Sequence, residues 1–307
     1  MSPWVFSVPV RVALILGLSC AGGSGAIQAA APAVRAVQDD LGGTVEVAAA
    51  PLRIVSLAPG ATEMLFAAGA GGQLIATVQY SSEPPAARSV PRIGDVAAID
   101  MERLVALHPD VVISWPAGGN PAQRAKIAAL GIPLYRQQVA RLADLPVSLR
   151  RLGVLAGTTA VAEPAATALE ARLRALSRTY SVHEYRPTVL LQVWNRPIYT
   201  IGGQHLMSDA LEICGARNVF ADLPEPGPLV DTEAVIGRNP DIILAAAPPG
   251  EGAAWVADWQ RFASLAAVRN HRVVAFENQA LSRLGPSVLG ATEELCRTIA
   301  RLSRGSW

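Results

Sequence analysis

The side chains of this protein that are best suited to contact a ligand are a few aromatic residues at the ends of apolar segments. Phe, Trp and Tyr make up only 5% of the 307 residues. Four of them nevertheless follow short apolar runs or lie in the polar segments after them: Tyr80, Trp115, Trp194 and Tyr199. Aromatic faces offer broad apolar contact, and their gathering in loops predicts a site for a flat or large apolar ligand.

The histidines and cysteines provide no evident catalytic or metal set. The histidines are His108, His183, His205 and His271, and none is spaced from another His or Cys as zinc ligands are. No GxSxG elbow and no acid pair within one motif appears. We therefore expect that the protein is not an enzyme and that it holds no resident metal and no cofactor. A periplasmic hydrolase or metalloenzyme is the alternative class of protein, but the sequence offers no set of nucleophile and base for it.

The first residues resemble a secretory signal. Arg11 precedes the apolar run VALILGL, and small residues follow up to Ala29, where we expect cleavage. The run is too short for a transmembrane helix. Cys20 raises the alternative of a lipid anchor, but a lipobox prefers a branched aliphatic residue where Gly17 stands. We favour a cysteine that is discarded with the signal peptide, residues 1–29.

Removal of the signal leaves two cysteines, Cys214 and Cys296. An even pair in an exported protein predicts a disulfide, and two separate buried thiols are the alternative. The bond would close a loop of about 80 residues, which corresponds to roughly 4–5 kcal/mol in the chain-entropy model.

Net charge and composition bound the possible partners. The formal net charge is +1 and 51% of the residues are hydrophobic. Balanced charge without a basic run argues against a nucleic-acid or membrane-surface partner. The length suggests about two domains.

Short apolar runs alternate with helical patterns after residue 40. The expected strands are 53–57, 74–78, 111–114, 132–135 and 188–193. Strands spaced by helices indicate parallel βα units. The segments DMERLVALHPDVVISW and DTEAVIGRNPDIILAA share one layout, since six residues separate Glu102 and Glu233 from the Pro-Asp pair that follows each of them. This repeat predicts two similar α/β lobes.

A helical pattern over 162–181 joins the two halves. Apolar residues recur at helical spacing, and Pro164 fits a first turn. A helix of this length is expected to resist large hinge bending, whereas most hinged binding proteins cross between lobes by strands or loops.

Ligands of open parallel sheets lie beyond the carboxyl ends of the strands. The loops after the expected strands are 58–60, 78–85, 114–120, 193–205, 247–252 and 276–287. Trp115 then faces a cleft or, alternatively, covers the core. Tyr80 faces the ligand or packs on the turn at Pro84 and Pro85. Only one of Trp194 and Tyr199 is expected to face the ligand.

Two further tryptophans and two histidines are better explained by structure. Trp255 and Trp259 lie four residues apart on an expected helix, which favours core packing. His108 and His271 stand at helix-to-strand turns. His205, in the segment GGQHLMSD, is either a polar loop residue or, for a haem ligand, an axial candidate together with Tyr80.

Ordered motifs give the chain a family resemblance. The motifs are RIVSLAPGATEMLFAAG, QYSSEPP, ERLVALHPDVVISWPAGGN, LLQVWNRPIYTIGG, LEICGARNVF and SRLGPS, and the resemblance that they carry covers about residues 44–303. In order and spacing they resemble the periplasmic vitamin B12-binding proteins of ABC importers. These belong to the helical-backbone (class III) substrate-binding proteins, which also carry haem and ferric siderophores.

The resemblance implies roles for individual residues. Tyr80 matches the family's corrin-contacting tyrosine, Trp115 its cleft tryptophan and Tyr199 an aromatic of the second lobe. The segment from Asn278 to Ser282 matches its last ligand-contacting loop. Cys214 and Cys296 match its disulfide pair, and Glu233 its second-lobe glutamate that docks on permease arginines. The full predicted ligand set is Tyr80, Trp115, Trp194, Tyr199, Asn278, Gln279, Leu281 and Arg283.

The sequence also departs from the family pattern. The first-lobe docking glutamate corresponds to Ala122, and a second-lobe tryptophan corresponds to Gly227. The segment ENQALS lacks the acidic and aromatic residues of the family loop. For Glu233, the alternative is a purely structural acid at a helix start. For Arg283, the alternative is a solvated arginine.

We therefore expect two Rossmann-like α/β lobes with parallel sheets joined by a long backbone helix. The expected divisions are a signal peptide at 1–29, an N-terminal lobe at 30–140, linking helices at 141–182 and a C-terminal lobe at 183–307. The resemblance implies a monomeric periplasmic protein that binds cobalamin or a related corrinoid and delivers it to permease subunits. The alternative ligand is haem or a ferric siderophore, although Arg196 and Arg283 are the only evident cleft arginines for an anionic chelate.

Overall fold

The computed structural model describes Met1 and residues 34–49, 52–181 and 185–303. Met1–Ala31 and Pro32–Trp307 are separate units, and the description below concerns the second. The predicted signal segment after Met1, with Cys20 and the cleavage point, lies outside the described residues, and so does His183. Within the described residues, no helix combines the length and the apolar character needed to cross a bilayer.

The first sheet contains four parallel strands, β3 Ile54–Ser56, β4 Leu74–Ala76, β5 Val111–Ser114 and β6 Leu134–Arg136. Their order is β4-β3-β5-β6. Every residue of β3 and β5 is buried, as expected when helices cover both faces of a parallel sheet.

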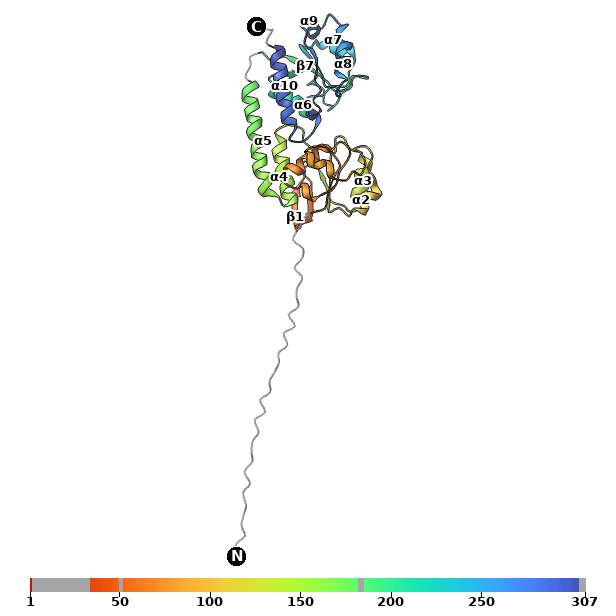
Figure 1. The fold of residues 1–307 in the computed structure, drawn as a ribbon, viewed down its shortest axis with the longest axis vertical. Helices are drawn as coiled ribbons and strands as arrows, with labels where there is room; N and C mark the ends of the chain where they lie inside the picture. Colours follow the sequence, from red (N-terminus) through yellow and green to blue (C-terminus); the bar gives the residue numbers. More distant parts are fainter. Residues whose placement is uncertain (2–33, 50–51, 182–184, 304–307) are drawn as a thin grey trace. The chain divides into compact units, whose positions relative to one another are not determined.

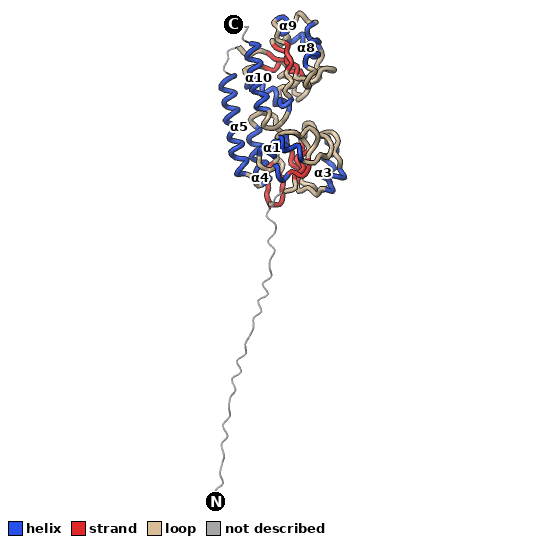
Figure 2. The backbone as a smooth tube through the Cα atoms, viewed as in Figure 1, coloured by secondary structure: helices blue, strands red, loops and turns tan. Residues whose placement is uncertain are grey.

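The second sheet repeats this plan with β7 Thr188–Gln192, β8 Arg217–Asn218, β9 Ile242–Ala245 and β10 Val273–Ala275. Its order is β10-β9-β7-β8, also wholly parallel. In both sheets the second strand in sequence lies on one side of the first, and the third and fourth lie on the other. The predicted pair of similar α/β lobes is thereby confirmed (Figure 2).

Helices connect and cover these strands. They are α1 Pro59–Ala67, α2 Met101–Ala106, α3 Pro121–Ala129, α6 Leu206–Ile213, α7 Thr232–Arg238, α8 Gly252–Gln260, α9 Ala266–Arg269 and α10 Val288–Ser303, with short 3-10 turns at η1 Gly71–Gln73, η2 Pro85–Ser89 and η3 Gln279–Ser282. Pro59 and Pro121 occupy the first turns of α1 and α3, where the missing N–H removes no helical hydrogen bond.

The repeated Pro-Asp motif has the same structural role in both lobes. The Asp110 carboxylate accepts a hydrogen bond from the Arg53 N–H at 2.7 Å, and Asp241 accepts one from the Thr188 N–H at 2.8 Å. Each bond ties the start of the lobe's third strand to the start of its first. The helix before each motif is capped in the same way, by Asp100 on α2 and Asp231 on α7. The sequence repeat therefore reflects repeated hydrogen bonding.

Two antiparallel helices link the lobes. α4 Asp144–Ala156 packs against α5 Thr159–Tyr180, and α5 also contacts α1 of the first lobe and α6 and α10 of the second (Figure 1). The 22 residues of α5 span about 33 Å. The prediction of a long backbone helix is confirmed, but its start was wrong. The helix begins at Thr159, so Pro164 lies in its second turn and not in its first.

A β-hairpin that the sequence patterns did not predict precedes the first lobe. Its strands are β1 Val34–Gln38 and β2 Thr44–Ala48. The next two residues after β1, Asp39 and Asp40, are acids whose side chains are almost wholly buried. Asp39 pairs with Arg136, and Asp40 accepts hydrogen bonds from the hydroxyls of Tyr135 and Ser148. The hairpin is thus attached to β6 and α4 by contacts between residues about one hundred positions apart.

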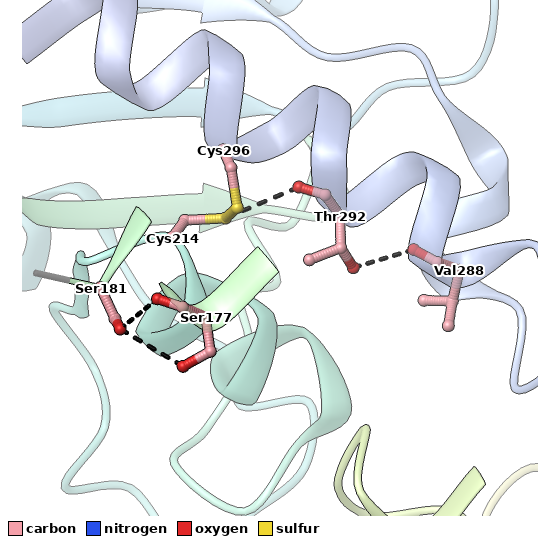
Figure 3. The surroundings of a disulfide bond; sticks show 6 residues. All are labelled: Ser177, Ser181, Cys214, Val288, Thr292 and Cys296. Atoms are coloured by element: carbon pink, nitrogen blue, oxygen red, sulfur yellow. Dashed lines mark hydrogen bonds between the residues drawn. A yellow bond between two sulfur atoms is a disulfide. The ribbon is translucent and has the colours of Figure 1, made fainter. Parts of the chain in front are cut away.

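The disulfide between Cys214 and Cys296 is present, as predicted. It joins the end of α6 to the middle of α10, and both cysteines are buried (Figure 3). The Cys214 sulfur also lies 3.6 Å from the Thr292 carbonyl oxygen one turn earlier on α10. The bond closes an 82-residue separation and fixes two helices of the second lobe to each other.

Candidate functional site

A cavity of about 670 Å³ lies at the carboxyl ends of the central strands of both sheets. Residues 58–61 after β3 and Trp115 after β5 line it from the first lobe. Residues 193–194 after β7 and 246–248 after β9 line it from the second. In each lobe these are the two strands from which the chain continues to opposite edges of the sheet. Such a switch point is where open α/β sheets bind ligands.

Aromatic side chains line this cavity from both lobes. Tyr80 and Trp115 belong to the first lobe, and Trp194 and Phe276 to the second. Tyr80 is 81% exposed and Trp194 is 53% exposed. Large aromatic groups left this open are unusual for a folded core but suit the contact faces of a binding site. The arrangement provides broad apolar surfaces on two opposing protein walls.

Tyr80 is held out by an unusual backbone conformation. Its φ is 64°, a left-handed value that a bulky residue rarely adopts. The loop is anchored beneath it by buried hydroxyls, since Thr77 Oγ1 lies 2.6 Å from Thr62 Oγ1 and 2.9 Å from Ser81 Oγ. Arg92 also donates to the Ser81 carbonyl oxygen at 2.7 Å. Strained backbone that is fixed by its surroundings is frequent at ligand sites. The exposed ring of Tyr80 is not packed on the turn at Pro84 and Pro85.

Trp115 both covers core residues and lines the cavity, so the two alternatives are not exclusive. It is half-buried and packs against the main hydrophobic core. The indole lies directly on Gly118, where an added Cβ would be 1.9 Å from a ring carbon. The Gly119 N–H closes the turn by donating to the Trp115 carbonyl oxygen. A glycine at position 118 is therefore required for this placement of the indole ring.

Trp194 is positioned by the second lobe's interior. Its ring meets Trp255 edge-on, with centroids 6.4 Å apart. Gln192, two residues before Trp194, is buried and accepts a hydrogen bond from the Trp259 indole N–H at 2.8 Å. The Gln192 amide nitrogen donates to Asn195 at 2.9 Å. Trp255 and Trp259 are buried, as predicted, and they support the loop that carries Trp194.

The segment 278–284 forms the second lobe's other wall. Its predicted members Asn278, Gln279, Leu281 and Arg283 all line the cavity. The Asn278 amide is already engaged, because its oxygen caps η3 and its nitrogen donates to Glu294 at 2.6 Å. Leu281 is buried, and Arg283 is the one cationic side chain among the described residues that line the cavity.

Two residues from the sequence argument lie elsewhere. Tyr199 pairs through its backbone with Trp194 and Leu229 and is not among the residues that line this cavity. His205 caps α6, where its Nδ1 accepts a hydrogen bond from the Met207 N–H at 3.1 Å. Burial lowers the pKa of His205. This histidine lines a smaller hollow beside Arg141, so it is no axial candidate for a group in the main cavity.

Glu233 lies on a different face of the second lobe. It is exposed in the first turn of α7. It borders a separate hollow of about 670 Å³ that also includes Ile198 and Phe262. Its placement leaves the side chain available to a partner.

Sequence reasoning missed several residues of the cavity wall. Gln137 follows β6, a strand end that the predicted loops left out. Phe276 begins the predicted loop 276–287 but was not named as a ligand residue. Met207 lies within α6, and its sequence position gave no such signal. Among the described residues, no group of three or more His, Cys, Asp or Glu side chains could hold a metal ion.

Comparison with known proteins places this geometry in a family. A model of the periplasmic binding protein family matches residues 54–280. The vitamin B12-binding protein of Pectobacterium carotovorum is 34% identical over 261 residues, which cover 84% of this chain and 92% of that protein. The protein of the same name from Vibrio cholerae is 35% identical over 245 residues, with 80% and 87% coverage.

Solved structures agree with these relatives. The crystal structure of the periplasmic vitamin B12-binding protein BtuF of Vibrio cholerae matches with a TM-score of 0.75 and 32% identity, over 83% of this chain and 99% of that chain. The periplasmic heme-binding protein RhuT from Roseiflexus sp. RS-1 matches with a TM-score of 0.71 and 25% identity, over 82% and 98% of the two chains.

Proposed function

This chain belongs to the periplasmic binding protein family, and from that premise we propose that it binds cobalamin or a related corrinoid in the cavity between its lobes. The loaded protein then delivers the corrinoid to the permease of an ABC importer. The family assignment makes the chain a periplasmic substrate-binding protein. The identity of the ligand and of the membrane partner is the proposal.

One observation carries the choice of ligand. Aromatic rings line the cavity from both lobes, with the exposed Tyr80 and the half-buried Trp115 on one side and the exposed Trp194 on the other. A corrin ring is broad and has two apolar faces, so it can contact both walls at once. The relatives named vitamin B12-binding proteins support the same choice.

The proposed mechanism is binding without chemical conversion. Apolar contact with the ring faces supplies affinity, and a few polar groups at the wall orient the ligand through its peripheral amides. The corrinoid is cargo and not a cofactor. We propose a monomer, with a signal peptide at 1–29 removed on export, without lipid at Cys20, and with lobes at 30–140 and 183–307 linked by 141–182.

Docking on the permease is proposed to involve Glu233. An exposed carboxylate at a helix start can pair with an arginine of a partner protein. Charges at the rim of an interface mainly change the rate at which the two proteins associate. The first lobe differs, because α3 is capped by Asn120, begins with Pro121 and Ala122, and has no acid in its first turn. Contact by the first lobe would therefore use another group.

Haem is the second candidate, supported by the likeness to a heme-binding protein. With His205 outside the cavity, Tyr80 is the remaining axial candidate of the two predicted from the sequence. A ferric siderophore would require several cations, and Arg283 alone faces the cavity among the described residues. The single cation argues against a siderophore, and the relatives named vitamin B12-binding proteins favour a corrinoid over haem.

Equilibrium dialysis of the purified protein against cyanocobalamin tests the proposal. We expect saturable binding of one corrinoid per chain with a sub-micromolar Kd. Binding that fails to saturate, or that is equal for a heat-denatured sample, would exclude a specific corrinoid site.

A further inference from the structure

Gln137 is a buried amide in the wall of the cavity. It directly follows β6, is 1% exposed, and lines the cavity beside Trp115. Its backbone N–H donates to the Ser114 carbonyl oxygen at 2.8 Å, which continues the pairing of β6 with β5. The position of the residue is therefore fixed by the sheet.

The side-chain nitrogen of Gln137 has no hydrogen-bond partner within the described part of the chain. A buried donor without an acceptor costs free energy, because it gives up hydrogen bonds to water and gains none. Native proteins contain few such groups, and each calls for an explanation. At the wall of a binding cavity, the natural explanation is an acceptor that arrives with the ligand.

Other buried polar groups do not share this combination. The amide of Gln192 is also buried, but Trp259 and Asn195 satisfy both of its ends. Thr158 Oγ1 is the other unpaired buried atom among the described side chains, and it lies at the start of α5, away from the cavity wall. In this described set, Gln137 alone combines an unpaired donor with a place in the cavity lining.

The surroundings indicate which acceptor it receives. A carboxylate would bring a negative charge to a largely apolar wall, and such burial is costly without a cation. Arg283 is the one cation among the described lining residues, and it belongs to the opposite lobe. A neutral carbonyl oxygen needs only one N–H donor and suits the site.

We propose that Gln137 donates a hydrogen bond to a neutral carboxamide oxygen on the rim of the corrin ring and so selects amidated corrinoids. This inference rests on the proposed corrinoid function. It assigns one polar specificity contact to the first lobe, beside the aromatic platform of Trp115.

The test compares Gln137→Leu with Gln138→Leu, the same substitution at the next residue, which is outside the cavity lining. Thermal unfolding without ligand and Kd values for cyanocobalamin and cobinamide are measured for each protein. For Gln137→Leu we expect an unchanged or higher Tm without ligand, because an unpaired donor is removed. We expect binding of both corrinoids to weaken about three- to tenfold, as for the loss of one neutral hydrogen bond. Gln138→Leu should leave both Kd values unchanged.

Each other result overturns the inference. Unchanged affinity in Gln137→Leu would mean that no ligand acceptor reaches the amide. A lowered Tm of Gln137→Leu, together with a comparable loss of corrinoid affinity in Gln138→Leu, would indicate that Gln137 has a structural role. Loss for cyanocobalamin alone would move the acceptor from the ring to the nucleotide portion. Should Gln137→Leu not fold, Gln137→Met gives the same comparison. Failure of the wild-type protein to bind either corrinoid would instead refute the proposed function.

Discussion

The Glu63 carboxylate accepts a hydrogen bond from the Ser287 hydroxyl, with 2.8 Å between Oε2 and Oγ. The bond connects α1 of the first lobe to the residue directly before α10 of the second. The backbones approach closely beside it, since a Cβ on Gly60 would lie 2.8 Å from the Leu284 nitrogen. The two lobes are thus joined at a buried point next to the cavity.

Glu63 should make stability depend on pH. Burial raises the pKa of its carboxyl above the ordinary value of 4.5, while hydrogen bonds from Ser287 act in the opposite direction. The folded protein therefore holds this proton more tightly than the unfolded chain does. The free energy of unfolding contributed by Glu63 falls as pH rises from about 4.5 through the raised pKa.

Glu63→Gln removes this ionisation and keeps an oxygen for Ser287. Urea unfolding across the same pH range should show that the variant gains stability relative to wild type as pH rises. Glu102→Gln, at an exposed position of α2, is the matched control for the substitution of a glutamate by glutamine. A constant difference between Glu63→Gln and wild type at every pH would contradict the assignment.

Reduction of the disulfide should destabilise the second lobe. With a separation of 82 residues, the chain-entropy model predicts a loss of about 4.5 kcal/mol in the free energy of unfolding. Urea unfolding of the mature chain with and without reductant measures it. The double variant Cys214→Ala and Cys296→Ala should be insensitive to reductant. Two free thiols in the denatured, unreduced mature protein would disprove the bond.

The fold was largely predictable because its signals are local. The apolar runs of β5 and β7 and the Pro-Asp pairs that precede β5 and β9 can be recognised without knowledge of the tertiary structure. The hairpin of β1 and β2 was missed because its attachment depends on Asp39 and Asp40, whose partners lie about one hundred residues away. The start of α5 was misjudged because the apolar periodicity begins only after its first turn.

Only those residues of the site that follow the ends of strands could be predicted from the sequence. Tyr80, Trp115 and Trp194 follow strands and reach the cavity. Tyr199 does not, because its direction depends on backbone pairing with Leu229, which no local pattern encodes. Gln137 follows the end of β6, but its sequence position did not show that the side chain is buried, because this burial arises from tertiary packing.

Tyr80 and Tyr199 provide a matched pair for testing the cavity. Tyr80→Ala should weaken corrinoid binding about tenfold or more, because it removes an exposed aromatic face from the wall. Tyr199→Ala should leave the Kd within about twofold, since this side chain is outside the lining. Isothermal titration measures both. Equal losses in the two variants would show that the ligand extends beyond this cavity.

Glu233→Arg should separate ligand binding from delivery. Glu233 lies outside the cavity lining and is exposed on α7, so corrinoid affinity should not change. Transporter-dependent uptake should fall, because the substitution replaces an attractive charge with a repulsive one. Glu46→Arg, at an exposed position of β2, is the control. Normal uptake with Glu233→Arg would remove this residue from the docking surface.

The corrinoid assignment is tested most directly by absorption titration of the purified mature protein with cyanocobalamin, cobinamide and haemin under the same conditions. We expect sub-micromolar binding of both corrinoids, and we expect this binding to be greatly weakened in Trp115→Ala and in Tyr80→Ala. Tight binding of haemin, with no binding of either corrinoid, would contradict it.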